Sequence, residues 1–529
     1  MDNTNLTHLA SQLVIAGFAD KYINREVKEL IHTYRVGGII LFSRNIGTPE
    51  EVLQLTTDLQ KEARKAGYDY PLLICADQEN GIVRRLGDGT TVFPGAMAQG
   101  ATDHPRYAYD IGYATGKELL ALGINWNLAP SIDVNNNSNN PVIGVRSFGE
   151  SPEKVAEFGR ASMKGMQDAG MITTIKHFPG HGDTNTDSHL GIPVIEHDMN
   201  RLEEVELKPF TACINQGADT VLTAHIHFPA IESENGLPAT LSKSVITHLL
   251  REKMHFNGVV TTDCMEMEAI SKTIGTEKGA VATIKAGSDF AMISHTFERQ
   301  KGAIKEIMHA IDSGELTEET IRKASERIER LKKKYLNWDN IKLEYSGVPE
   351  FVGGLEHKEL AAEVYRNSTT IVRNEQLLPL SDEEKVLVIC SSSDVKGWAE
   401  DKDDEASNFG KAIRTYHATA DIAQMHDLAS TKEVNELFKR AKQYNVIIIS
   451  LLEMSPENSQ RLLVNKLSEH HIPVVVVASK NPYALQYFPG VSAYINTYEP
   501  NLSALKMAAG AIFGQEEVNG KLPITVPKL

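Results

Sequence analysis

The chain has 529 residues, more than the roughly 100–200 residues of a typical single domain, so we expect at least two domains. With 41% hydrophobic and 23% charged residues, its composition is that of a globular protein, and no segment reaches the ~18 uninterrupted apolar residues of a membrane span. The 54 Lys and Arg residues against 70 Asp and Glu residues give a formal net charge of −16, which disfavours a general nucleic-acid-binding protein because phosphate backbones are repelled.

Two further features concern the cellular compartment. The N-terminal stretch MDNTNLTHLASQLVIAG lacks the basic region and cleavage site of a secretory signal, so we expect a cytoplasmic protein that does not insert into a membrane. The four cysteines lie far apart and form no CxxC pair, which argues against a disulfide scaffold and against a structural zinc site: Cys75, Cys213, Cys264 and Cys390.

From the N-terminus to about residue 335, eight short apolar runs alternate with amphipathic, helix-like stretches. Runs of this length rich in Ile, Val and Leu are typical of buried parallel strands. Eight strand–helix alternations predict a (β/α)8 barrel of the TIM type, with a doubly wound open sheet as the alternative. The runs are Ser11–Phe18, Gly37–Phe42, Pro71–Asp77, Ile124–Pro130, Met171–His177, Asp219–His225, Asn257–Asp263 and Ser288–Ser294.

A second domain is expected after a linker. Residues 336–354 lose the helical periodicity and contain Trp338, Pro349 and several glycines, which is typical of a connecting segment. Residues 355–529 then alternate again between helix-like and strand-like segments, which predicts a smaller α/β/α sandwich. Its expected strands are Lys385–Ser391, Asn445–Leu452, Val474–Ser479 and Val491–Tyr498.

Polar residues collect at the carboxyl ends of four predicted strands. These are Asp77, the pair Lys176-His177, His225 and Asp263. In a barrel all carboxyl ends of the strands open onto one face, where barrel enzymes build their active sites. A single such residue is usually a helix cap, but four chemically competent positions on four strands predict one catalytic site.

The densest polar segment is residues 176–189, which read KHFPGHGDTNTDSH. Its Gly and Pro residues predict a loop over a pocket. Asp187 and His189 are two residues apart, so the carboxylate could orient the imidazole, and a histidine is suited to proton transfer near neutral pH. The alternative is an ordinary surface turn.

A metal site was the competing interpretation of these histidines. His225-Ile226-His227 is an HxH sequence after a strand, and two-metal barrel hydrolases use HxH together with a Lys and further His and Asp residues. In those enzymes HxH belongs to the first strand, whereas here Lys176 precedes it. The order therefore does not favour metal catalysis, and no metal or organic cofactor is expected.

Several motifs of this chain resemble those of a known enzyme family. The loop at residues 176–189 resembles the K-H-F-P-G-H-G-D-x-x-x-D-S-H signature of the β-N-acetylhexosaminidases in glycoside hydrolase family 3. Further blocks match in the same order: DQENGIVRRL at residues 77–86, LAPSIDV at 128–134, NPVIGVRSFG at 140–149, IVRN at 371–374, LLPL at 377–380 and GKLPITVP at 520–527. The resemblance spans nearly the whole chain, and the 14-residue loop carries most of its specificity.

The resemblance implies an exo-acting, retaining β-N-acetylhexosaminidase that removes non-reducing N-acetylglucosamine from cell-wall muropeptide or chitin-type oligosaccharides. Asp263 would be the nucleophile, and His189, paired with Asp187, the acid/base. The residues implied to bind the sugar are Asp77, Arg85, Arg146, Lys176 and His177. The alternative role for Arg85 and Arg146 is in internal ion pairs. Asn80 and Ile82 depart from the usual Gly and Arg of the first block.

Three other functions remain open at this point. A β-glucosidase or β-xylosidase of the same family takes its acid/base Glu from the second domain and usually reads S-D-W at the nucleophile, whereas this chain has Thr262-Asp263-Cys264. A phosphorylase would resolve the intermediate with phosphate instead of water. A non-catalytic sugar-binding protein would be expected to lack the nucleophile or the acid/base. The oligomeric state and the role of the second domain are not predicted.

Overall fold

The eight predicted strands form a closed parallel barrel. In the computed structural model, which describes residues 3–185, 191–392, 400, 405–452 and 458–527, neighbours in the chain pair in order and β8 closes onto β1. Every described residue of these strands is buried except Asp263, which is half-buried. The barrel prediction is therefore confirmed. The strands are β1 (Val14–Ala16), β2 (Gly38–Leu41), β3 (Leu73–Ala76), β4 (Trp126–Asn127), β5 (Ile172–Phe178), β6 (Thr220–Thr223), β7 (Val259–Cys264) and β8 (Phe290–Ile293).

The helices of the barrel surround the strands, and α3 (Pro49–Lys65) shows why they form. Thr48 and Glu51 make a reciprocal capping box at its start, and Pro49 occupies the first turn, where a missing N–H costs nothing. Its buried residues recur every three or four positions and face the barrel. The remaining helices of this part are α1 (Asn3–Ser11), α2 (Arg25–Glu29), α4 (Ala96–Ala101), α5 (Pro105–Ala121), α6 (Pro152–Asp168), α7 (Met199–Glu204), α8 (Leu207–Asn215), α9 (Glu268–Ser271), α10 (Thr276–Ala286), α11 (Phe297–Asp312) and α12 (Glu318–Tyr335), with π-helical turns at Leu30–Tyr34 and Ser244–Lys253.

The second domain is a six-stranded mixed sheet with helices on both faces, as predicted. Its strand order is β11-β10-β12-β13-β14-β9, with only β9 antiparallel to its neighbour. Alternate residues of the central strands enter two separate hydrophobic cores, one under α15 and α16 and one under α14 and α17. The elements are β9 (Thr370–Asn374), β10 (Val386–Ser392), β11 (Asp421–His426), β12 (Val446–Leu451), β13 (Val474–Ala478), β14 (Ala493–Asn496), α13 (Leu355–Ser368), α14 (Glu405–Tyr416), α15 (Thr431–Ala441), α16 (Ser459–Glu469) and α17 (Leu502–Ile512).

The two outer strands of this sheet, β9 and β11, were not expected from the sequence. Both lie at the edges of the sheet, and several of their residues are exposed. An edge strand buries only part of its surface, so it lacks the continuous apolar run by which the central strands were found. The four expected strands of the second domain all exist, as β10, β12, β13 and β14.

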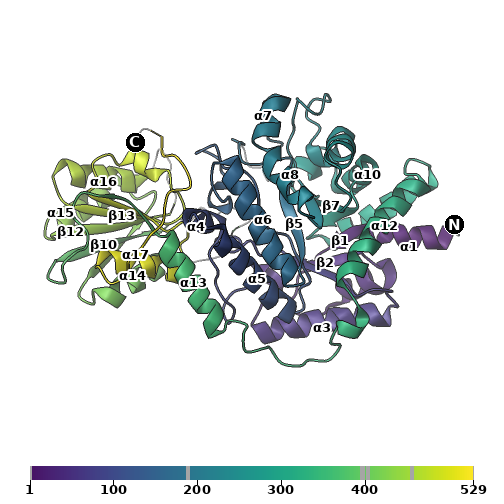
Figure 1. Cartoon of the computed structure of the whole chain (residues 1–529), viewed down its shortest axis with the longest axis horizontal. Coiled ribbons are helices and arrows are strands. Elements are labelled where there is room, and N and C mark those ends of the chain that lie inside the picture. The colour runs from purple at the N-terminus through teal and green to yellow at the C-terminus, as the bar shows by residue number, and fades with distance from the viewer. Residues whose placement is uncertain (1–2, 186–190, 393–399, 401–404, 453–457, 528–529) are drawn as a thin grey trace.

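The two domains lie side by side and share a hydrophobic core (Figure 1). Ile82 and Met97 of the barrel belong to the same cluster as Tyr498 of the second domain. At its edge the buried Glu499 carboxylate accepts hydrogen bonds from the backbone N–H of Gly95 and from the Tyr365 hydroxyl. The segment between α12 and α13 passes along one side of the barrel (Figure 1). Ile82 and Val83, in the motif block at residues 77–86, thus lie at the domain junction.

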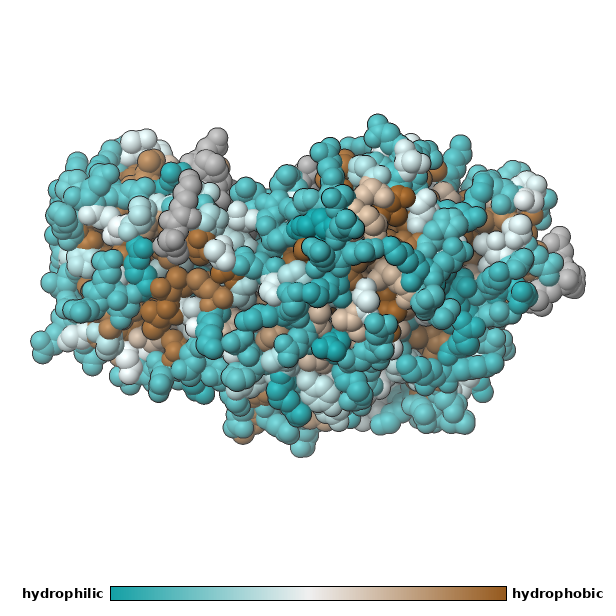
Figure 2. Space-filling view, turned by 45° about the horizontal axis from the view of Figure 1, so that its top comes forward, coloured by the Kyte–Doolittle hydropathy of each residue, from teal (hydrophilic) through white to brown (hydrophobic). Residues whose placement is uncertain are grey.

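The outer surface is mainly hydrophilic. On the face shown in Figure 2, hydrophobic side chains gather in small patches separated by hydrophilic ones. Within the described residues, none of the helices combines the length and the apolar character needed to cross a membrane.

Candidate active site

A cavity of about 410 Å³ opens at the carboxyl ends of the barrel strands. Six of the predicted site residues line it, which confirms that they lie together: Asp77, Arg85, Arg146, Lys176, His177 and Asp263. Asp77 directly follows β3. Lys176 and His177 are among the last three residues of β5, and Asp263 is the penultimate residue of β7. The barrel topology thus brings Asp77 and Asp263 into one cavity although almost 190 residues separate them in the sequence.

Asp77 is held between two cations. Its Oδ1 accepts a hydrogen bond from Lys176 Nζ at 2.8 Å, and its Oδ2 lies 3.3 Å from Arg85 Nη2. Burial by itself would raise the pKa of Asp77, but the charges of Lys176 and Arg85 outweigh it and hold the pKa below its usual range. Asp77 is therefore a carboxylate at neutral pH, able to accept hydrogen bonds from vicinal sugar hydroxyls.

Glu79 forms the centre of the same network, although we expected no role for it. Arg146 donates two hydrogen bonds to its carboxylate, at 2.9 and 2.8 Å, and Lys176 Nζ lies 2.7 Å from its Oε1. Burial opposes ionisation of Glu79, yet Arg146 and Lys176 hold its pKa far below the usual value. Arg146 and Lys176 are thus fixed in place by ion pairs, and the internal ion pair weighed for Arg146 exists.

His177 is oriented from both sides of its ring. Its Nδ1 lies 2.7 Å from the buried Asp133 Oδ2 and donates to it, while its Nε2 lies 3.2 Å from Arg146 Nη2 and accepts from it. This geometry fits the neutral tautomer with the proton on Nδ1. The backbone N–H of His181 also donates to Asp133, at 2.7 Å, so one carboxylate joins β5 to the start of the following loop.

Asp263 differs from the other carboxylates in the cavity. It is half-buried rather than buried, and its Oδ1 accepts a hydrogen bond from the backbone N–H of Cys264 at 2.7 Å. A carboxylate at a strand end with an oxygen facing the cavity is placed to approach a bound substrate. Lys176 forms ion pairs with Asp77 and Glu79, and Arg85 forms one with Asp77.

Asp187 and His189, the predicted acid/base pair, lie outside the described residues. The described start of their loop is firmly attached to the barrel. Asn140 Nδ2 donates to the carbonyl oxygens of His181 and Gly182, both at 2.8 Å. A side chain on Gly182 would collide with the carbonyl of Val134, only 1.7 Å from a Cβ at that position, so this turn requires glycine.

The opposite wall of the cavity comes from other strand ends and from the second domain. Arg44 follows β2, and its guanidinium donates to the backbone carbonyls of Phe18 and Ser294, at 2.8 and 2.6 Å, and lies 3.1 Å from the His295 ring. Glu400 of the second domain also lines the cavity, paired with Lys480 at 2.6 Å. The second domain therefore contributes a carboxylate to the rim.

The HxH histidines are used for packing. His225 Nδ1 lies 2.9 Å from the Thr240 hydroxyl and its Nε2 lies 3.0 Å from the Cys264 carbonyl oxygen, while His227 Nδ1 lies 3.0 Å from the Leu237 carbonyl oxygen. His225 is not among the residues that line the cavity. A polar residue at a strand end therefore predicted a place in the cavity wall for Asp77 and Asp263, but this prediction was wrong for His225.

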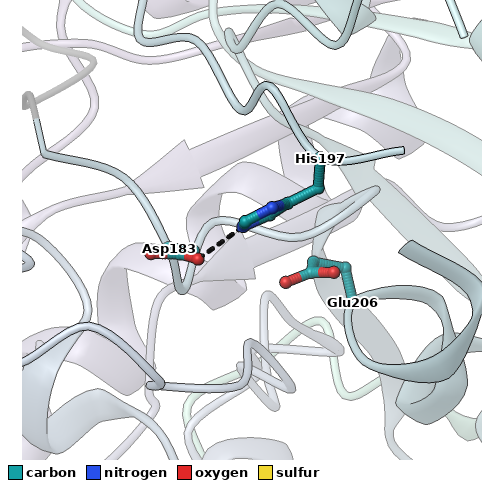
Figure 3. Close-up of side chains that lie close together, drawn as sticks. All are labelled: Asp183, His197 and Glu206. Atoms are coloured by element: carbon teal, nitrogen blue, oxygen red, sulfur yellow. Dashed lines mark hydrogen bonds and ion pairs between the residues drawn. The ribbon is translucent and has the colours of Figure 1, made fainter. Parts of the chain in front are cut away.

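Another group of ligand-type side chains consists of Asp183, His197 and Glu206 (Figure 3). The ligand atoms lie within 4.8 Å of one another, which is close enough for a metal ion. However, Asp183 already accepts from His197 Nε2 at 2.7 Å, and both Glu206 oxygens lie within 3.0 Å of Arg201 Nη1. The guanidinium supplies the positive charge that a metal would bring, so this cluster is an ion-pair network at the base of the loop.

Sequence reasoning overlooked Glu79, Asp133 and His181 as site residues. All three stood in the motif blocks quoted above, so the signal was present. Glu79 is two residues after Asp77 and Asp133 is seven residues after Trp126 of β4, positions that bring both to the carboxyl-end face of the barrel. Their partners come from other strands, which no local pattern reveals.

A closed parallel barrel with ionised carboxylates and cations converging from several strand ends defines a barrel enzyme whose site is at the carboxyl-end face. Comparisons with known proteins make this specific. The family model described as the glycosyl hydrolase family 3 N-terminal domain matches residues 6–331, and that of the C-terminal domain matches residues 369–529. The chain belongs to glycosyl hydrolase family 3 and is a glycoside hydrolase.

Individual relatives cover nearly the whole chain. Beta-hexosaminidase A of Pseudoalteromonas piscicida is 31% identical over 559 aligned positions, spanning 95% of this chain and 91% of that protein. The solved structure of a family 3 β-N-acetylglucosaminidase from Paenibacillus sp. FPU-7 is 37% identical, with a TM-score of 0.93 over 98% of this chain and 99% of that one. The β-glucoside phosphorylase BglX is 25% identical, with a TM-score of 0.83 over 99% and 95%.

Proposed function

We propose that this protein is an exo-acting β-N-acetylhexosaminidase that removes non-reducing β-linked N-acetylglucosamine with retention of configuration. The observation that carries the proposal is the shared cavity, in which the Asp263 carboxylate faces the ion-paired group formed by Asp77, Arg85 and Lys176. The similarity to the hexosaminidase and the β-N-acetylglucosaminidase over almost the full length supports the same substrate class.

In the proposed mechanism the ion-paired group holds the sugar. The Asp77 carboxylate accepts hydrogen bonds from hydroxyls, and Arg85 and Lys176 donate to hydroxyl or carbonyl oxygens. Arg146 is held by Glu79 and His177 by Asp133, so both side chains are already fixed in the cavity wall and need little reorganisation when the substrate binds.

Chemistry then follows in two displacements. Asp263 attacks the anomeric carbon and forms a covalent glycosyl-enzyme, while His189 protonates the departing oxygen. His189 next removes a proton from water, which attacks the same carbon and releases Asp263. Asp187 would orient the imidazole and stabilise its protonated form. No metal or organic cofactor takes part in this sequence.

The first test compares initial rates on aryl β-N-acetylglucosaminide and aryl β-glucoside, each with and without inorganic phosphate. We expect release from the N-acetyl substrate alone, unchanged by phosphate. A preference for the plain glucoside would contradict the substrate assignment. The Asp263→Ala variant should lose at least ~10³-fold in turnover, and added azide should restore it and give the α-glycosyl azide by a single inverting displacement.

The second test identifies the acid/base. Glu400 is the matched competitor of His189, since family 3 β-glucosidases take this residue from the second domain and Glu400 lines the cavity. With an activated aryl leaving group, the acid/base variant should give the β-glycosyl azide, because azide attacks the intermediate without needing a general base. We expect this product from His189→Gln and not from Glu400→Gln. The reverse result would assign the role to Glu400.

A second candidate function is phosphorolysis. Among the described residues, Arg44 bonds to backbone carbonyls and the His295 ring rather than to a carboxylate, which leaves a cation on the cavity wall that phosphate could approach. The phosphorylase among the structural relatives makes this reaction relevant to the fold. Strong acceleration by phosphate, lost in Arg44→Gln, would favour it.

The natural substrate is either a cell-wall muropeptide or a chitin-type oligosaccharide. The cavity wall beyond the proposed sugar site combines the Arg44 cation with the mutually neutralised Glu400–Lys480 pair. Arg44, on which the charge of Glu266 also acts, is the cation of this wall that an anionic leaving group would approach. We therefore expect kcat/KM to be higher for a fragment with a free carboxylate than for the neutral disaccharide, and Arg44→Gln to remove that preference.

A further inference from the structure

A second cavity, of about 400 Å³, lies at the opposite end of the barrel. It is lined by residues that precede β1, residues that precede β3, and one face of α12. Since those segments enter their strands at the amino ends, the cavity is on the face remote from the active site. Its volume is within the ~300–1,000 Å³ of small-molecule sites. The lining residues are His8, Leu9, Gln12, Tyr68, Asp69, Tyr70, Arg322, Ser325, Glu326, Ile328, Glu329 and Lys332.

Lys332 is the unusual group in this cavity. Its residue is only 3% exposed, yet within the described part of the chain its ammonium makes no hydrogen bond or ion pair. The next two lysines of α12 behave normally: Lys333 pairs with Glu329 at 2.8 Å, and Lys334 pairs with Asp219 at 2.7 Å. Lysines are almost never buried unless they are paired, because an uncompensated charge is costly to desolvate.

Lys332 shares its cavity with an opposite charge, that of Asp69, which partly offsets the effect of burial on its pKa, and a second cation, Arg35, lies against Tyr68. Arg35 stacks on Tyr68, 5.1 Å from the ring centroid, and donates to the backbone carbonyls of Ala66 and Gly67 rather than to a carboxylate. Burial lowers the pKa of His8, and the charges of Arg35 and Lys332 lower it further, against the opposing effect of Asp69. Two cations therefore act on the interior of one cavity.

Among the described residues, no acidic side chain of the cavity forms an ion pair with Lys332. Asp69, Glu326 and Glu329 are exposed at its rim. Glu326 forms an ion pair with Arg322, and Glu329 pairs with Lys333 as described. Two buried polar atoms are also without a hydrogen-bond partner in the described structure, the Ser325 hydroxyl and Arg35 Nε. Among the described residues the cavity thus has a buried ammonium without an ion-pair partner and a hydroxyl without a hydrogen-bond partner, beside apolar walls.

We propose that this cavity is a binding site for a small organic anion, a carboxylate or a phosphate monoester. Its acidic group would accept hydrogen bonds from Lys332 and Ser325, and its body would pack against Tyr68 and Ile328. Such a ligand would give Lys332 the direct ion-pair partner that no described residue provides, since Asp69 acts on it without forming an ion pair. The site is independent of the catalytic cavity, so the proposal stands or fails separately from the proposed function.

The test is ligand-dependent thermal unfolding of the full chain at constant ionic strength. The probes are glucose 6-phosphate, gluconate and inorganic phosphate, with glucose as the uncharged control. We expect a saturable rise in unfolding temperature with at least one anion and none with glucose. A response to inorganic phosphate and glucose 6-phosphate but not to gluconate would identify the phosphate group as the feature recognised, and the opposite pattern the carboxylate.

Two variants locate the binding. Lys332→Met should weaken anion binding by at least ~10-fold, because the charged hydrogen-bond donor is lost, whereas the matched change Lys323→Met, at an exposed lysine of α12 that pairs with Glu319 outside the cavity, should leave it unchanged. A second measurement uses the unaltered protein: the anion should protect Lys332 from acetylation by acetic anhydride, read by mass spectrometry. Absence of any saturable response, equal binding by Lys332→Met, or acetylation unaffected by the anion would overturn the proposal.

Discussion

Replacing Lys332 by Met should stabilise the ligand-free protein at neutral pH. Burial lowers the pKa of Lys332 from its ordinary value of 10.5 to about 8. A difference of about 2.5 pKa units corresponds to about 3.4 kcal/mol at ~1.36 kcal/mol per unit. Methionine has a similar length and an apolar end, so the variant keeps the packing and removes the charged group. A gain of about 3 kcal/mol is therefore the upper expectation.

The sign of the pH dependence follows from the same values. The unfolded state, in which Lys332 titrates near 10.5, binds this proton more tightly than the folded state, in which it titrates at about 8. Below pH 8 both states are protonated and the full cost is present. Between pH 8 and 10.5 the cost declines, so the advantage of Lys332→Met should be greatest at pH 7 and small at pH 10.5.

The assay is urea unfolding of both proteins at pH 7 and at pH 10, followed by a signal assigned to the barrel and without added organic anions. Lys323→Met, at an exposed lysine of α12 outside the cavity, is the control and should change the free energy of unfolding by less than about 0.5 kcal/mol. The other ionisable groups of the cavity are common to all three proteins, so their titration cancels in the comparison: His8, Tyr68, Asp69, Tyr70, Arg322, Glu326 and Glu329. A loss of stability in Lys332→Met, or a gain equal at both pH values, would refute the reasoning.

Three more predictions concern buried ionisable residues. Glu79→Ala leaves the buried Arg146 without its bidentate partner, so the free energy of unfolding should fall by about 3 kcal/mol and turnover should be lost. Urea unfolding measures the first effect and initial rates the second. If stability and turnover are both retained, Glu79 is dispensable. Burial lowers the pKa of His181 to about 4, so stability should decline as the pH falls from 6.5 to 4, and His181→Asn should flatten that decline in urea unfolding at several pH values. Glu499→Ala should destabilise the domain junction by about 2 kcal/mol by leaving the Gly95 N–H unpaired, seen as an earlier second-domain transition in calorimetry; an unchanged trace would mean that the shared apolar core suffices.

Much of the fold was predictable because parallel barrel strands are buried on both faces. The run Gly37–Phe42 is apolar throughout, and that composition is visible in the sequence before any neighbouring strand is known. The edge strands β9 and β11 bury only part of their surface, so buried and exposed residues are mixed along them. No continuous apolar run therefore indicates these strands in the sequence. Whether a segment is central or at an edge is decided by the neighbours it acquires on folding.

The same distinction applies to the site. Barrel topology brings every strand end to one face, so Asp77, Lys176 and Asp263 could be placed together from their positions in the sequence alone. His225 met the same criterion but points to Thr240 and a backbone carbonyl. A local pattern reports that a polar group ends a strand, whereas the direction of its side chain depends on the surrounding packing.

What the sequence determined by itself was the order of the elements, the face that carries the chemistry and the family signature, because each depends on the types and spacing of nearby residues. Only the tertiary structure decided which charges meet. Glu79 joins Arg146 across 67 positions, while Lys332, in a run of three lysines, is the one directed inward without a partner among the described residues. The free energy of a charge depends on its burial and on its partners, and both are properties of the folded chain.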